Sequence, residues 1–107
     1  MKLFDADDRA RRKAYKAVQQ PRIDSIVECM VEAHAFTNEH YIMINRDLFL
    51  EHFFNELHHV HAGFAFKAGD RSHMTDQLMS FIDSHRTPIL RDLMKQLNTK
   101  TDVWDWT

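Results

Sequence analysis

The sequence has very few of the residues that form turns and disulfides. Of its 107 residues, two are glycine, two are proline and one is cysteine. Because tight turns depend on glycine and proline, their scarcity argues against a sandwich or barrel and favours helices with short connections. The single cysteine, Cys29, excludes an intrachain disulfide framework and fits a reducing compartment.

Long apolar runs and export signals are lacking too. No run approaches the roughly 20 apolar residues that cross a bilayer, so we expect no membrane partner. The start, MKLFDADDRARRK, has an acidic cluster where a signal peptide has its apolar segment, and we therefore expect a cytoplasmic protein. The length fits one small domain, which we place at residues 1–98, followed by an aromatic tail at residues 99–107.

Motifs that carry familiar enzyme chemistry are also missing. There is no glycine-rich phosphate loop, CxxC pair or dinucleotide fingerprint. Asp83, Ser84 and His85 are consecutive, but neighbours on a helix point about 100° apart and cannot form a catalytic relay. These absences favour a binding module without cofactor over an enzyme, although a metal-dependent activity stays open.

The strongest pattern covers residues 45–63 and predicts a central amphipathic helix at about 46–61. Asn45 is a good N-cap, and Gly63 supplies a C-terminal stop. At about 100° per residue, six large apolar side chains fall on one face. They are Phe49, Leu50, Phe53, Leu57, Val60 and Phe64.

Similar periodicity predicts four further helices. Their ranges are about 5–20, ended by Pro21, then 22–36, 72–85 with Ser72 as N-cap, and 87–98 with Pro88 in the first turn and Asn98 at the end. The predicted fold class is therefore all-α, a compact bundle of about five helices around the central helix. The apolar segments 41–44 and 64–66 leave a minor two-stranded β patch as an alternative.

One row on the central helix has side chains that bind metals. His52, Glu56 and His59 stand at i, i+4 and i+7 on adjacent turns. One helix cannot complete a tetrahedral site, so a divalent metal would need a further ligand, for which the candidates are His34, His40 and His85. A solvated or hydrogen-bonded row is the alternative.

Charge is distributed unevenly along the chain. Residues 1–22 hold seven basic and three acidic side chains, net +4, whereas residues 23–66 hold one and seven, net −6. The basic side chains of the first helix form a stripe consisting of Arg9, Arg12, Lys13 and Lys16. The stripe is interpreted as a solvated face or one that pairs with the acidic helices of the same chain. The alternatives are a surface for an acidic protein and a nucleic-acid contact, which the net charge of −2 disfavours.

The tail holds two tryptophans, Trp104 and Trp106, alternating with aspartates. They are expected either to fold back over the core or to anchor a partner or a second copy of the chain. Together, the size, the uneven charge and the tail predict a small non-enzymatic regulatory protein that binds another protein. The alternatives are a helical metal-binding hydrolase or sensor and a nucleic-acid-binding protein.

Overall fold

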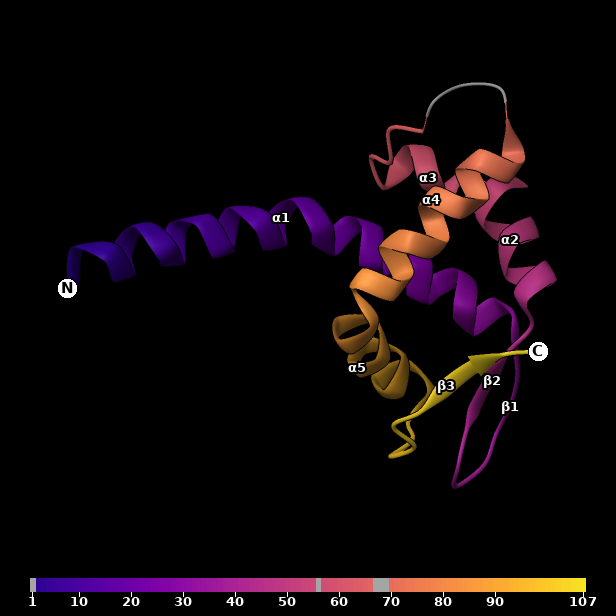
Figure 1. The fold of residues 1–107 in the computed structure, drawn as a ribbon. Coiled ribbons are helices and arrows are strands. Elements are labelled where there is room, and N and C mark those ends of the chain that lie inside the picture. The colour runs from indigo at the N-terminus through magenta and orange to yellow at the C-terminus, as the bar shows by residue number, and fades with distance from the viewer. Residues whose placement is uncertain (1, 56, 67–69) are drawn as a thin grey trace.

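The computed structural model describes the backbone of residues 2–55, 57–66 and 70–107, and the side chains of these residues from residue 7 onwards. The described residues form five helices and a small three-stranded sheet (Figure 1), which confirms the predicted mostly α-helical class with a minor β patch. In chain order the elements are α1 (Lys2–Glu32), β1 (His34–Thr37), β2 (Ile42–Ile44), α2 (Arg46–Asn55), α3 (His58–His61), α4 (Arg71–Ser84), α5 (Arg86–Leu97) and β3 (Trp104–Trp106).

Helix α1 runs without interruption through Pro21, so the two predicted helices 5–20 and 22–36 are wrong as separate elements. A proline inside a helix removes one backbone hydrogen bond and costs about 3 kcal/mol. After Pro21, however, the helix buries Ile23, Ile26 and Met30 in the core. Burial of each such side chain contributes on the order of 1.5–3 kcal/mol, so the stabilisation from packing exceeds the cost of the proline. The helix ends at Glu32, and residues 34–37 form a strand instead.

The N-terminal half of α1 extends away from the other elements (Figure 1). We call residues 7–20 the arm. All side chains from residue 7 to residue 18 are exposed, and the molecule measures 48 × 40 × 18 Å along its principal axes. The Tyr15 hydroxyl lies 2.7 Å from His85 Nε2, which ties the base of the arm to the body.

The sheet has the order β1–β2–β3. Strand β2 is antiparallel to β1 and parallel to β3, with Ile42 beside Trp104 and Ile44 beside Trp106. The strand expected at 41–44 is therefore present, but its expected partner at 64–66 is wrong. Phe64 and Phe66 do not belong to a strand; their rings stack 5.2 Å apart and pack against the core cluster.

The predicted central helix at 46–61 is two helices, because Leu57 between α2 and α3 has a left-handed backbone with φ of 56°. This turn redirects the chain, so Leu57 and Val60 are 53% and 60% exposed rather than in the core. The start was predicted correctly, since the Leu48 backbone N–H donates to Asn45 Oδ1 over 3.0 Å. Phe49 and Phe53 are fully buried as expected.

The strain at Leu57 gives a first testable prediction. A left-handed conformation costs a residue with a side chain about 1–2 kcal/mol. Glycine avoids this cost, but it loses more conformational entropy on folding, so only part of the cost is recovered as stability. We expect Leu57→Gly to raise the free energy of unfolding by roughly 0.5–1 kcal/mol in urea melts. Leu57→Ala keeps the left-handed cost and is the matched control, expected to change stability by less than about 0.5 kcal/mol. A less stable Leu57→Gly protein would contradict this account.

The last two helices close the core against α1. Asp70, not the predicted Ser72, caps α4, because its Oδ1 accepts a hydrogen bond from the Ser72 backbone N–H over 3.0 Å. Helix α5 begins at Arg86 and ends at Leu97. Asn98 caps it with a left-handed φ of 51°, which confirms the predicted stop at this residue. The fully buried side chains of these helices are Leu78, Ile82, Ile89 and Leu93.

Candidate functional site

A groove lies between the arm and the beginning of α5. Its volume is about 500 Å³, and four cationic side chains line it: Arg11, Arg12, Lys16 and Arg91. Tyr15, Ile23 and Pro88 contribute apolar surface, and no Asp or Glu of the described residues belongs to its lining. We call this the basic groove.

His85 fixes the geometry of the basic groove. Its Nδ1 lies 2.8 Å from the Phe81 carbonyl oxygen, which can only accept, so Nδ1 carries the proton and donates. In the neutral ring Nε2 is then the acceptor for the Tyr15 hydroxyl. The ring also stacks on Phe81 with centroids 4.0 Å apart. These contacts hold the arm at a defined position relative to α5, so the groove is preformed.

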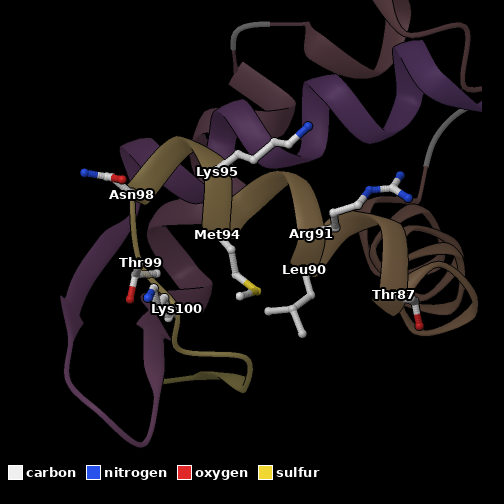
Figure 2. A pocket seen from close by; sticks show the side chains of 8 residues that line it. All are labelled: Thr87, Leu90, Arg91, Met94, Lys95, Asn98, Thr99 and Lys100. Carbon is white, nitrogen blue, oxygen red and sulfur yellow. The ribbon is translucent and has the colours of Figure 1, made fainter.

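A second hollow lies along the adjoining face of α5, toward the segment that leads into β3 (Figure 2). It has a volume of about 600 Å³. Figure 2 shows Leu90 and Met94 pointing to the same open side, where they form an apolar floor. Arg91, Lys95 and Lys100 belong to the lining, again without a carboxylate among the described residues. We call this the α5 hollow; it meets the basic groove at Arg91.

The cations of the basic groove have only weak partners within the chain. Arg12 pairs with Asp8 over 2.8 Å on the exposed surface of the arm. Arg91 Nε lies 3.7 Å from Asp92 Oδ1. An exposed pair such as Arg12–Asp8 contributes about 0–1 kcal/mol, so a partner carboxylate can replace it at little cost.

The predicted basic stripe is divided by the structure. Arg12 and Lys16 line the basic groove, whereas Arg9 and Lys13 do not. Arg11 and Arg91 line it although neither was predicted. No sequence signal identifies Arg91, because its proximity to the arm arises only from the packing of α5 on α1. The assignment of these residues to a partner stays a prediction.

The two tryptophans of the tail have different environments. Trp104 is buried, with 2% of its surface exposed, and Trp106 is half-buried with its ring 5.1 Å from that of Phe49. The tail therefore folds back onto the core. A partner could reach part of Trp106, but it would have to displace β3 to reach Trp104.

The residues of the predicted metal row do not share one helix. His52 lies in α2 with Nδ1 3.5 Å from Glu32 Oε2, and His59 lies in α3 with its ring against those of Phe53 and Phe66. Glu56 is outside the described residues. Across residues 2–55, 57–66 and 70–107, no group of three or more His, Cys, Asp or Glu is arranged to hold a metal ion. His52 and His59 therefore do not stand on adjacent turns of one helix, and metal binding stays a prediction.

In comparisons with known proteins, no family model, curated protein or solved structure matches the chain. None of the helices in the described part of the chain has the length and apolar character needed to span a membrane.

Proposed function

We propose that the protein is a small non-enzymatic regulatory module that binds an acidic, amphipathic segment of another protein. The observation that supports this is the composition of the basic groove and the α5 hollow. Both combine cationic side chains with an apolar floor, and neither lining includes a carboxylate among the described residues. The proposal places the protein in the cytoplasm, where the thiol of buried Cys29 remains reduced.

The two parts of the lining would contribute differently to binding. Leu90 and Met94 offer apolar surface whose burial supplies about 25 cal/mol per Å². Arg11, Lys16 and Arg91 attract and orient carboxylates, which affects mainly specificity and the association rate. A helix with one leucine face and one glutamate face satisfies both requirements, as in other helix-in-groove complexes. Nucleic acid would use the cations but leave the apolar floor uncovered, and the net charge of −2 opposes it.

A fluorescein-labelled synthetic helix with a leucine face and a glutamate face tests the proposal by fluorescence anisotropy. We expect binding that weakens with salt, because exposed charges are screened. Arg91→Glu and Arg11→Glu should each weaken it at least about tenfold, since reversal replaces attraction with repulsion in the groove. Arg46→Glu, at the first turn of α2 and remote from both linings, is the matched control and should bind as the wild type does.

A second peptide and an oligonucleotide complete the experiment. A peptide with serine in place of leucine should lose binding if the apolar floors are covered. Absence of binding by the leucine peptide, or equal binding by wild type and Arg91→Glu, would contradict the proposal. A single-stranded oligonucleotide that binds more tightly than the peptide would instead support the nucleic-acid alternative.

A further inference from the structure

Most of the arm is exposed to solvent. Its side chains from residue 7 to residue 18 are exposed, including Tyr15 and Val18 at 56% each. Its contacts with the body lie near its base. The Tyr15 hydroxyl bonds to His85, whose ring also stacks on that of Tyr15, and Gln20 Nε2 donates to Asp92 Oδ2 over 3.2 Å. Further out, Arg12 pairs with Asp8 of the arm itself. An isolated helix of this length is marginal in water, so a surface that packs on the arm would stabilise it.

A second groove on the flank of α1, opposite in charge to the basic groove, offers such a surface. It lies between the second half of α1 and α5 and has a volume of about 650 Å³. Its lining contains the acidic side chains of Asp24, Glu28, Glu32 and Asp92 and the basic side chain of Lys95. Val27 and Val31 provide apolar surface. We call this the acidic groove.

The periodicity of α1 points two basic side chains of the arm, Arg9 and Lys13, to the side of the helix on which the acidic groove lies. At about 3.6 residues per turn, a whole number of turns separates Arg9 from Val27, and the same number separates Lys13 from Val31. The members of each pair therefore project in the same direction. Val27 and Val31 line the acidic groove, so Arg9 and Lys13 face the same side further along the helix.

We propose that two copies of the chain associate through antiparallel α1 helices, with the arm of each copy lying in the acidic groove of the other. The two-fold axis passes near the Gln20–Pro21 bond. In this register Arg9 opposes Glu32 and Lys13 opposes Glu28, symmetrically about that bond. Because the interface is isologous, each opposition occurs twice. This inference concerns a different groove from the proposed function and does not rest on it.

Charge complementarity between the copies would relieve repulsion within each. Asp24, Glu28 and Glu32 stand at i, i+4 and i+8, and Arg9 and Lys13 at i and i+4, all in one helix. Like charges at this spacing destabilise a helix slightly. Antiparallel association places each acidic row against a basic row, so the unfavourable pairs of the monomer are offset by favourable pairs across the axis.

Sedimentation velocity on the full chain at low salt tests the proposal. We expect a concentration-dependent monomer–dimer equilibrium that shifts to monomer when salt is raised from about 0.05 M to about 0.5 M. Lys13→Glu and Glu28→Lys should each raise the dimer dissociation constant at least about tenfold, since each reversal changes two contacts. The double variant Lys13→Glu/Glu28→Lys restores both pairings with their signs exchanged and should return to within about threefold of wild type.

The controls change the same charges elsewhere on the chain. Lys100→Glu and Asp102→Lys alter exposed side chains before β3 and should dimerise as the wild type does. Circular dichroism and urea melts establish that each variant is folded. A wild-type chain that stays monomeric at low salt up to about 100 μM would overturn the proposal. A double variant whose dimer dissociation constant is no lower than those of the single variants would also overturn it. The Arg91→Glu measurement with the peptide is independent of dimer formation, because Arg91 neither belongs to the arm nor lines the acidic groove.

Discussion

Replacing Trp104 with alanine is expected to lower the free energy of unfolding by about 3–5 kcal/mol, the range for removal of a large buried aromatic side chain. Trp104 is 2% exposed and lies in β3 beside Ile42. Its ring meets that of Trp106 edge to face, with centroids 4.8 Å apart, and the Arg86 guanidinium lies 4.2 Å from the ring centre. The truncation removes all these contacts and leaves a cavity under the sheet.

Urea denaturation followed by circular dichroism measures this loss. Val103→Ala is the matched control, because Val103 is the adjacent residue and is 45% exposed; its change should stay within about 0.5 kcal/mol. Trp104→Phe should cost less than Trp104→Ala, since the ring is largely retained and the buried Nε1 has no hydrogen-bond partner among the described residues. If Trp104→Ala were as stable as Val103→Ala, the tail would not be a structural part of the core.

Much of the fold could be predicted because the amphipathic helices follow local rules. The Asn45 cap and the Asn98 stop each depend on a side chain and its immediate neighbours. The pairing of β2 with β3 depends instead on segments far apart in the sequence, and nothing in Trp104–Trp106 alone specifies a strand parallel to Ile42–Ile44. Pairings of that kind are decided by the packing of the whole chain.

The two wrong helix boundaries have a common physical origin. Proline at position 21 is a local signal for a helix end, and Leu57 has a local preference for a helix interior. In each case tertiary burial is larger than the local term: Ile23 and Ile26 hold α1 together, while Phe53 and Phe64, whose ring centroids are 5.6 Å apart, remain in the core beside the turn at Leu57.

The candidate site was predictable only where it lies on one helix. Arg12 and Lys16 follow from their spacing on the arm, but Arg91 joins them through the packing of α5 against α1. A surface formed by two elements needs their relative orientation, which periodicity within one element does not contain.

Replacing Pro21 with alanine is expected to raise the free energy of unfolding by about 2 kcal/mol. Proline in a helix interior costs about 3 kcal/mol. It also lowers the conformational entropy of the unfolded chain, which offsets up to about 1 kcal/mol of this cost. Pro21 lies inside α1 with its side chain exposed, so alanine restores the missing backbone hydrogen bond without disturbing the core. The melting temperature should rise by roughly 8 °C or more for a chain of this size.

Thermal and urea melts of Pro21→Ala test this, with Gln19→Ala as the control at a half-buried position of the same helix. Gln19→Ala should change stability by less than about 0.5 kcal/mol, because glutamine and alanine differ little in helix propensity. A Pro21→Ala protein that is less stable than wild type would show that the proline is needed for the orientation in which α1 packs against α5. Because the proposed two-fold axis passes beside Pro21, sedimentation velocity of the same variant then shows whether this orientation of α1 also affects the dimer dissociation constant.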